Sequence, residues 1–370
     1  MRSDSHWMDY ALSLARRALG VTWPNPSVGC VLVRDGRLIG YGNTQTGGRP
    51  HAETVALERA IMHFGADIVR GATAYVTLEP CSHHGGTPPC AEALVAAGIA
   101  RAVVALRDPD HRVNGRGVAL LRRAGIIVDE GLGQAEAKEI NHGFLMRVEQ
   151  GRPSYTLKLA MSLDGRIALA NGESRWITGE EARAQGHALR ASHDAILVGI
   201  GTALADDPEL TCRLPGLATR SPVRIVLDSR GRLPPTSRLA QTAQTTPTWL
   251  VTGPAADRAA QASLEAVGVR LLRTAIGPGG VIDLPSLGGV LARLGLTRVL
   301  IEGGGAVAAN FIAANLVDRI EVFRSGLVLG AEARAAVGEL SPASIAAAPR
   351  FRTALAHVLG EDLAEGWTHP

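Results

Sequence analysis

The sequence is short of cysteine, lysine and long apolar runs, and each shortage excludes a class of protein. Only four cysteines occur in 370 residues, which argues against a disulfide framework and favours a reducing compartment such as the cytoplasm. No run approaches the ~18 consecutive apolar residues of a membrane helix. The N-terminal stretch MRSDSHWMDY also lacks the apolar core of a signal peptide. We therefore expect a cytoplasmic protein that does not bind membranes.

Lysine is nearly absent. Of the 38 basic residues only two are lysines, Lys138 and Lys158, and the others are arginine. Such a bias fits a genome-wide composition effect, so a lysine that remains is of interest. The basic residues are scattered, and no window combines a dense basic run with aromatic residues. The net charge of +3 therefore gives no indication of a nucleic-acid partner.

The first 150 residues alternate between helical and strand-like patterns. Apolar residues between 7 and 18 recur at helical spacing, and VGCVLVRDGRLIGYG predicts two strands around an Asp35-Gly36 turn. Further helices are expected over 52–64, 89–98, 117–124 and 134–148, and strands over 72–79, 101–106 and 126–130. This alternation predicts an α/β sandwich in which helices cover a sheet.

Gly151-Arg152-Pro153 is the best candidate boundary, because the pattern restarts after it. Strands are expected at SYTLKLAMS, AILVGI, VRIVLDS, TWLVTG, VRLLR, RVLIEGG and RIEVFR, and helices over 179–192, 255–267, 286–294 and 305–315. The Pro- and Thr-rich segment 234–248 is expected to be a surface loop, and no pattern assigns a role to 335–370. The sequence thus predicts two α/β domains, residues 1–150 and 151–370.

A group of His, Cys and Glu residues in the first half has the spacing of a catalytic metal site. His51 and Glu53 open a predicted helix, Cys81 follows a strand, and Cys90 opens the next helix. Tetrahedral zinc accepts one histidine and two cysteines, and a catalytic site keeps the fourth position for water. Glu53 would then move a proton of the activated water to the departing amine. H-x-E followed by a P-C…C pair is typical of zinc nucleobase deaminases.

Other interpretations of these residues remain open. A disulfide between the two ligand cysteines competes with the metal, although a reducing compartment disfavours it. Cys30 alternates with apolar residues in a strand and is expected in the core, and Cys212 also looks structural. His83 and His84 suit substrate contact or loop polarity better than metal ligation, because three better-placed ligands already exist.

Three dense motifs occur in the second half. They are KLAMSLDGRIA with GESRWIT (158–178), LADDPELTCR (204–213) and IEGGGAVAANF (301–311). The last predicts a strand, a glycine turn and a helix start, an arrangement that lets backbone approach a phosphate closely. An ordinary turn is the alternative. No acidic residue at the expected distance supports a Rossmann unit, which favours another kind of dinucleotide-binding domain.

The order PNPSVG, HAE, TLEPCSHHGGTPPC and DPDHRVNGRG closely resembles the deaminase half of the bifunctional deaminase/reductase family of riboflavin biosynthesis. Eight residues separate Cys81 from Cys90, whereas nucleic-acid and cytidine deaminases usually have P-C-x-x-C. The resemblance implies a cytidine-deaminase-like fold, zinc on His51, Cys81 and Cys90, and Glu53 as the proton shuttle. It also implies that Asn25 contacts the pyrimidine ring.

The second half resembles the reductase half of the same family, whose fold is like dihydrofolate reductase. The match runs from about 154 to 330 and fades in the C-terminal forty residues. It implies that NADPH contacts Ala160, Trp176, Thr202, Asp206 and the 304–310 turn, including Gly304 and Gly305. It implies that substrate meets Ser174, Arg190, Leu210, Arg213 and Glu302. Arg190 and Arg213 would clamp a sugar phosphate, because guanidinium matches phosphate in a bidentate way.

Lys158 and Asp206 are the candidate catalytic groups of this half. Lys158 lies in an otherwise apolar strand, where its ammonium would stand over the ribose and pass a proton. A snorkelling surface lysine is the alternative. Asp206 is an acid/base or orienting group, or else a helix cap or Asx turn ahead of Pro208.

Two positions depart from the family's pattern. Members often carry lysine or arginine where this chain has Gly86, and they read DPNP where this chain has residues 108–111, DPDH. Both positions lie where substrate is expected, so the departures concern substrate affinity more than chemistry. His84, His111 and Arg112 are the candidates to compensate.

The resemblance implies a two-step enzyme. The first half would deaminate 2,5-diamino-6-ribosylamino-4(3H)-pyrimidinone 5′-phosphate, and the second would use NADPH to reduce the ribosyl chain of the aminouracil product to ribityl. Its rivals are a nucleic-acid base deaminase with an accessory domain, and a pyrimidine-phosphate sensor that has lost one activity. We expect a small pyrimidine ribosyl phosphate and further copies of the chain as partners, and no nucleic acid.

Overall fold

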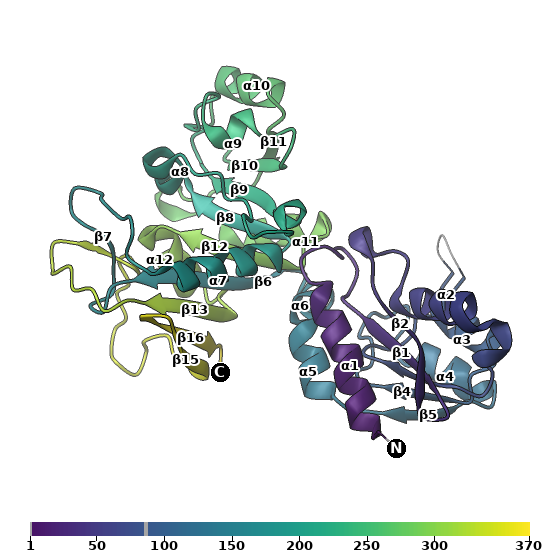
Figure 1. Cartoon of the computed structure of the whole chain (residues 1–370). Coiled ribbons are helices and arrows are strands. Elements are labelled where there is room, and N and C mark those ends of the chain that lie inside the picture. The colour runs from purple at the N-terminus through teal and green to yellow at the C-terminus, as the bar shows by residue number, and fades with distance from the viewer. Residues whose placement is uncertain (1, 85–87) are drawn as a thin grey trace. The chain divides into compact units, whose positions relative to one another are not determined.

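The chain divides at Gly151, whose left-handed backbone (φ 66°) ends helix α6. The computed structural model, which describes residues 2–84 and 88–370, consists of two units, Met1–Gly151 and Arg152–Pro370 (Figure 1). Each unit has its own sheet and its own helices. No helix among the described residues is long and apolar enough to cross a membrane.

The N-terminal unit is a five-stranded sheet in the order β2-β1-β3-β4-β5. The two strands around the Asp35-Gly36 turn are antiparallel, and β3, β4 and β5 run parallel. The strands are β1 Gly29–Arg34, β2 Arg37–Asn43, β3 Thr73–Val76, β4 Arg101–Val104 and β5 Ile127–Glu130. The helices are α1 Asp4–Arg17, α2 Ala52–Phe64, α3 Cys90–Ala96, α4 Arg116–Arg123, α5 Gln134–Ile140 and α6 His142–Gln150. The predicted α/β class is confirmed.

Two glycines of β2 determine where helix α2 lies, and this helix begins directly after the predicted metal ligand His51. A Cβ on Gly42 would lie 2.5 Å from the carbonyl oxygen of Ala52, and one on Gly40 would lie 2.3 Å from that of Ala56. Since atoms cannot approach so closely, only glycine lets α2 lie directly on the strand. The first turn of α2, with His51 and Glu53, is thereby fixed against the sheet.

The C-terminal unit contains a nine-stranded sheet in the order β11-β10-β9-β8-β12-β6-β13-β16-β15. Neighbours from β11 to β13 are parallel, and the last two strands are antiparallel. The strands are β6 Ser154–Met161, β8 Ala195–Gly199, β9 Val223–Leu227, β10 Thr248–Thr252, β11 Arg270–Arg273, β12 Arg298–Gly303, β13 Arg319–Arg324, β15 Arg352–Leu359 and β16 Asp362–Thr368. The helices are α7 Glu180–Ala191, α8 Ile200–Asp206, α9 Arg238–Gln241, α10 Arg258–Ala266, α11 Leu284–Arg293 and α12 Gly305–Ala313, and β7 Arg166–Ala168 pairs with β14 Arg334–Ala335 in a small sheet.

Several details differ from the sequence prediction. The helix expected over 134–148 is two helices, because the buried amide of Asn141 exchanges hydrogen bonds with the backbone of Ser27 between them. The segment 234–248 is not wholly a surface loop, since it contains α9 with Leu239 fully buried. The C-terminal residues, which had no predicted structure, add the β15–β16 hairpin to the main sheet.

Candidate active sites

The predicted metal ligands converge at one point in the N-terminal unit. His51 caps the start of α2, Cys81 follows β3, and Cys90 is the first residue of α3. His51 Nδ1 lies 3.3 Å from Cys90 Sγ and 3.7 Å from Cys81 Sγ. All three ligand atoms lie within 4.8 Å of one another. The four cysteines are free thiols, so the disulfide alternative is wrong, and Cys30 is buried in the core as predicted.

These distances fit a zinc ion. Bond lengths of ~2.3 Å to sulfur and ~2.0 Å to nitrogen place the ligand atoms of a tetrahedral site about 3.5–3.8 Å apart. The observed spacings of 3.3 and 3.7 Å are close to that value. The backbone N–H of Cys90 donates to Cys81 Sγ at 3.2 Å, which favours the thiolate form. Hydrogen bonds from Cys90 and then from His51 lower the pKa of Cys81 to about 4.

Glu53 is buried beside these ligands and lines the same cavity. Burial, followed by the nearby charge of Cys81, raises the pKa of Glu53 to about 7. A carboxyl group with a pKa near neutrality can both accept and return a proton. Glu53 therefore has the environment of a proton shuttle.

The cavity beyond Glu53 has a volume of about 150 Å³ and holds several further predicted residues. Asn25 lines it, with its amide donating to the carbonyl of Gly48 at 3.0 Å. His83 also lines it, and its Nδ1 is buried without a hydrogen-bond partner among the residues described. A buried polar atom in that condition is available to contact a bound molecule. His84, by contrast, is exposed and pairs with Glu92 at 3.4 Å.

Arg112 is the compensating candidate that reaches this cavity. Its guanidinium is bidentate to Asp110, with Nη2 2.5 Å from Oδ2. The hydrogen bond from Arg112 lowers the pKa of Asp110 to about 2. The His111 side chain is 92% exposed and is not among the lining residues, and Gly86 lies outside the described residues.

Glu79 is a residue of this site that the sequence analysis missed. Its buried carboxylate accepts backbone N–H groups of Asp108 (3.3 Å), Gly115 (2.9 Å), Gly117 (2.9 Å) and Val118 (3.2 Å). It thereby fixes the 108–118 loop that carries Asp110 and Arg112. The available signal was a carboxylate at the end of an apolar strand, two residues before the ligand Cys81.

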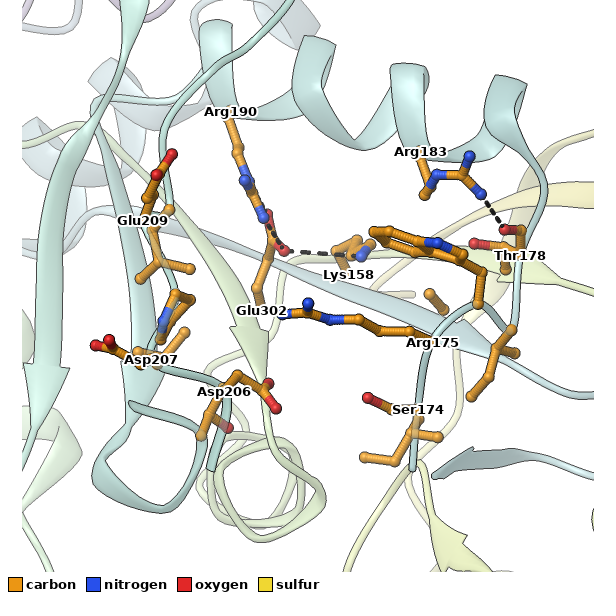
Figure 2. A pocket seen from close by; sticks show the side chains of 18 of the residues that line it. Lys158, Ser174, Arg175, Thr178, Arg183, Arg190, Asp206, Asp207, Glu209 and Glu302 are labelled. Atoms are coloured by element: carbon orange, nitrogen blue, oxygen red, sulfur yellow. Dashed lines mark hydrogen bonds and ion pairs between the residues drawn. The ribbon is translucent and has the colours of Figure 1, made fainter. Parts of the chain in front are cut away.

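The predicted residues of the second half also line one cavity, in which Figure 2 shows Arg190 and Lys158 directed toward Glu302. This cavity of about 540 Å³ is lined by Lys158, Ala160, Ser174, Trp176, Arg190, Thr202, Asp206, Leu210, Arg213 and Glu302. An adjoining cavity of about 710 Å³ shares several of these residues and adds Gly304 and Gly305. Residues from four separate segments of the chain are thus brought together.

Glu302 is the buried centre of this site. Arg190, which descends from α7, donates Nε to Oε1 at 2.7 Å and Nη2 to Oε2 at 2.8 Å. Lys158 Nζ lies 3.7 Å from Oε2 on the other side, as Figure 2 shows. Burial alone would raise the pKa of Glu302, but Arg190 and Lys158 outweigh it and lower the pKa to about 2. Glu302 is therefore an anion that orients both cations.

This arrangement changes the part that Arg190 can take in phosphate binding. Its Nη1 donates to the carbonyl of Thr211 at 3.0 Å, so each nitrogen of the guanidinium already donates to Glu302 or Thr211. Arg213 is 54% exposed and has only a loose contact with Glu209 at 3.8 Å. Of the two predicted clamp residues, Arg213 is the one whose guanidinium faces open space.

The glycine turn lies at the start of α12. The N–H of Gly304 donates to Thr202 Oγ1 at 3.1 Å, and a Cβ on Gly304 would lie 3.3 Å from that oxygen. The glycines of this turn line the adjoining cavity at the start of a helix, a position that suits a phosphate group of a dinucleotide. The Arg183 guanidinium lies 4.5 Å from the centre of the Trp176 ring, a stacked contact that the sequence analysis did not foresee.

Asp206 is the last residue of α8, a helix that was not predicted, so the helix N-cap alternative for it is wrong. The carboxyl end of this helix lies beside Lys158 and Ser174 in the cavity lining. The following residue, Asp207, adopts a left-handed conformation (φ 37°) that ends the helix.

Comparison with known proteins accounts for nearly the whole chain. The model of the RibD C-terminal domain matches residues 153–364, and the model of the cytidine and deoxycytidylate deaminase zinc-binding region matches residues 1–106. Riboflavin biosynthesis protein RibD of Escherichia coli is 42% identical, over 97% of this chain and 98% of its own length. The predicted resemblance is confirmed and extends beyond residue 330.

Solved structures give the same result. Acinetobacter baumannii RibD (form 1) superposes with a TM-score of 0.87 at 39% identity, over 99% of this chain and 98% of that chain. A diaminohydroxyphosphoribosylaminopyrimidine deaminase/5-amino-6-(5-phosphoribosylamino)uracil reductase of Thermotoga maritima superposes at 0.86 with 34% identity, over 99% and 98%. The predicted cytidine-deaminase-like and reductase folds are thereby confirmed.

Proposed function

This chain belongs to the RibD family of riboflavin biosynthesis proteins, a bifunctional deaminase and reductase, and from that premise we propose how its residues divide the two reactions. The deaminase is zinc-dependent and the reductase uses NADPH. The observation that carries the proposal is the convergence of His51, Cys81 and Cys90 within 4.8 Å beside Glu53.

The first half hydrolyses the amine of 2,5-diamino-6-ribosylamino-4(3H)-pyrimidinone 5′-phosphate. Zinc, when held by His51, Cys81 and Cys90, supplies an activated water. Glu53 accepts the proton of that water and returns it to the amine nitrogen. The carbon–nitrogen bond breaks, ammonia leaves and the ring carbon keeps the oxygen. A carboxyl pKa near 7 supports both proton transfers.

Substrate in the first half is held by polar groups of the small cavity. Asn25 and the buried Nδ1 of His83 bind the pyrimidine ring. Arg112, which is held in place by Asp110, meets the ribosyl phosphate. The bidentate pair with Asp110 fixes the guanidinium, but the carboxylate of Asp110 offsets its positive charge. We therefore expect weaker phosphate binding than a free cation gives.

The second half reduces the ribosyl chain of the aminouracil. The ribosylamine opens to an imine, and NADPH supplies the hydride that C1′ accepts. Lys158, which Glu302 orients, passes a proton to the substrate. Asp206 orients the reacting groups beside it, and Arg213 binds the phosphate with Ser174 and Leu210 nearby. The glycine turn at Gly304 and Gly305, together with Thr202, Ala160 and Trp176, holds the dinucleotide.

Both reactions belong in the cytoplasm, since the four free thiols suit a reducing compartment.

The chain also pairs with copies of itself. The edge strand β15 supports this proposal, because Leu355 and Val358 on it are 54% and 75% exposed, and an exposed apolar edge invites pairing. Light scattering with Leu355→Lys and Val358→Lys tests it: a monomeric wild type would contradict self-association.

Mass spectrometry of the products tests the function directly. The zinc-loaded protein is incubated with the diaminopyrimidine substrate, with and without NADPH. We expect the aminouracil alone without NADPH, and the ribityl product with it. The Cys90→Ser variant should form no aminouracil from the diaminopyrimidine. It should still reduce aminouracil that is added to it, because the reductase residues lie in the other unit. Deamination by Cys90→Ser at the wild-type rate would refute the metal assignment.

A further inference from the structure

Arg224 is the largest fully buried side chain of the protein, and none of the chemistry above uses it. It lies in β9, where it pairs with Ile196 of β8 and Thr248 of β10. Burial lowers its pKa to about 10, so the side chain is still a cation at neutral pH. A buried charge is costly unless it is well hydrogen-bonded, which raises the question of what this one holds.

All four Nη hydrogens of Arg224 have acceptors. Nη1 donates to the carbonyl of Glu209 at 3.2 Å and to Thr242 Oγ1 at 2.8 Å. Nη2 donates to the carbonyls of Leu239 at 3.2 Å and Thr246 at 2.6 Å. These acceptors are neutral, and three of them belong to α9 and the turn before β10. The fourth belongs to the loop that follows α8.

That loop, residues 206–213, carries much of the reductase cavity. Asp206, Leu210 and Arg213 line the cavity, and Asp207 and Leu210 both adopt left-handed backbone conformations, with φ of 37° and 55°. A residue with a side chain keeps such a conformation only when its surroundings impose it. The Glu209 carbonyl, which Arg224 holds, lies between these two strained residues.

The loop is held at two points from opposite sides. Arg224 of strand β9 donates to the backbone carbonyl of Glu209. Arg190 of α7 donates to the backbone carbonyl of Thr211, two residues further along, at 3.0 Å. Two buried guanidinium groups thus fix a short stretch of backbone on either side of Leu210. Arg213 extends from that stretch into the cavity.

We propose that Arg224 is a positioning residue for the reductase substrate: it fixes the Glu209–Leu210 backbone so that Arg213 and Leu210 meet the bound ribosyl phosphate. The inference rests on the role proposed above for the 206–213 loop. Arg224 holds the loop at Glu209, next to the predicted substrate contact Leu210, so the expected effect is on substrate binding.

Arg224→Lys tests the proposal, because lysine keeps the charge but its single ammonium cannot reach all four acceptors. We expect the KM for the aminouracil to rise about tenfold or more, the size of effect of a lost charge-assisted hydrogen bond, with kcat and the Kd of NADPH within about twofold. Arg270→Lys is the matched control, since Arg270 is an exposed arginine of the nearby strand β11. An unchanged KM in Arg224→Lys would overturn the proposal, as would a rise in the Kd of NADPH equal to the rise in KM.

Arg213→Ala, measured in parallel, separates this inference from the function on which it rests. A higher KM in Arg213→Ala with a normal KM in Arg224→Lys would refute only the positioning role of Arg224. An unchanged KM in Arg213→Ala would instead refute the phosphate role of the loop, and the inference would fail with it.

Hydrogen exchange on the unaltered protein tests the same inference should Arg224→Lys not fold. If Arg224 ties the loop to the sheet, the amides of 207–213 exchange only when β9 and β10 open with them. Exchange of the loop amides in a separate, faster opening that leaves β9 and β10 protected would overturn the proposal.

Discussion

Each half of the protein buries a glutamate beside its other candidate catalytic groups, Glu53 in the first and Glu302 in the second, and these two glutamates differ in their ionisation. The pKa of Glu53 is raised to about 7, whereas that of Glu302 is lowered to about 2. Burial acts in the same direction on both. The difference comes from the neighbours, since Glu53 lies near the anionic Cys81 and Glu302 lies between Arg190 and Lys158.

The comparison shows how one residue type serves two purposes. A carboxyl group with a pKa near neutrality exchanges protons, and one held as an anion orients cations. In the proposed reactions, the carboxyl group of the first half takes part in the chemistry, and that of the second half positions the lysine that does. The first three predictions below test this contrast, and the last two test the stability of the C-terminal unit.

The largest effect is expected from Glu53→Gln, which removes the exchangeable proton and keeps the shape. We expect deamination to slow by about 10²–10⁴-fold, the usual contribution of a positioned acid/base group, with zinc content and reductase activity unchanged. Glu58→Gln, on the exposed face of the same helix, is the control. Near-normal deamination with zinc still bound would remove Glu53 from the mechanism.

Glu302→Leu should show that the second glutamate is structural as well as functional. Its loss leaves Arg190 buried without its carboxylate, so the free energy of unfolding of the C-terminal unit should fall by about 3–5 kcal/mol. Urea unfolding measures it. The double variant Arg190→Leu/Glu302→Leu should recover part of the loss, because no unpaired guanidinium remains. A loss in the double variant equal to the sum of the losses in Arg190→Leu and Glu302→Leu would show that the pair is not coupled.

Lys158→Met tests the group that Glu302 orients. We expect reduction to slow by about 10²-fold, the lower end for loss of a proton donor, with deamination intact. The other lysine of the chain gives the control, since Lys138→Met changes an exposed side chain of the N-terminal unit. Full reductase activity in Lys158→Met would show that this lysine takes no part in the reduction.

His193 gives the C-terminal unit a pH dependence that does not involve either site. Burial, together with the charge of Arg298, lowers the pKa of His193 from 6.5 to about 3. The unfolded chain therefore binds a proton between pH 6.5 and 3 that the folded chain does not, so stability falls as the pH falls through that range. The slope is at most about 1.4 kcal/mol per pH unit.

Urea unfolding at pH 7 and pH 5 measures this slope in the wild type, in His193→Asn and in the exposed control His357→Asn. His193→Asn should flatten it and His357→Asn should not. An equal pH dependence in all three proteins would assign the slope to other groups.

The smallest effect is expected at the C-terminal hairpin. The buried Asp362 accepts the N–H of Gly179 at 2.7 Å, at the start of α7 that carries Arg190. Asp362→Ala should cost about 1 kcal/mol, as for the loss of a helix cap, and Glu361→Ala beside it should cost almost nothing. Thermal unfolding compares the two variants. Equal melting temperatures would show that Asp362 does not cap α7.

Local sequence signals were sufficient for the metal site. His51, Cys81 and Cys90 stand at the ends of elements with clear periodicity, and their residue types are those that zinc prefers. The helix start at residue 52, the Asp35-Gly36 turn and the glycine turn near 304 have the same kind of signal. By contrast, the break in the helix at Asn141 depends on a hydrogen bond to Ser27, more than a hundred residues away.

The sequence by itself determined the fold class and the ligand set of His51, Cys81 and Cys90, because these follow from residue type and periodicity within short segments, whereas the other candidate site residues came from the family resemblance. Only the tertiary structure showed the neighbours of each charged group. The sequence alone does not show that Glu302 pairs with Arg190, or that Arg224 is fully buried. Charge interactions depend on distances between segments remote in sequence, and those distances exist only in the folded chain.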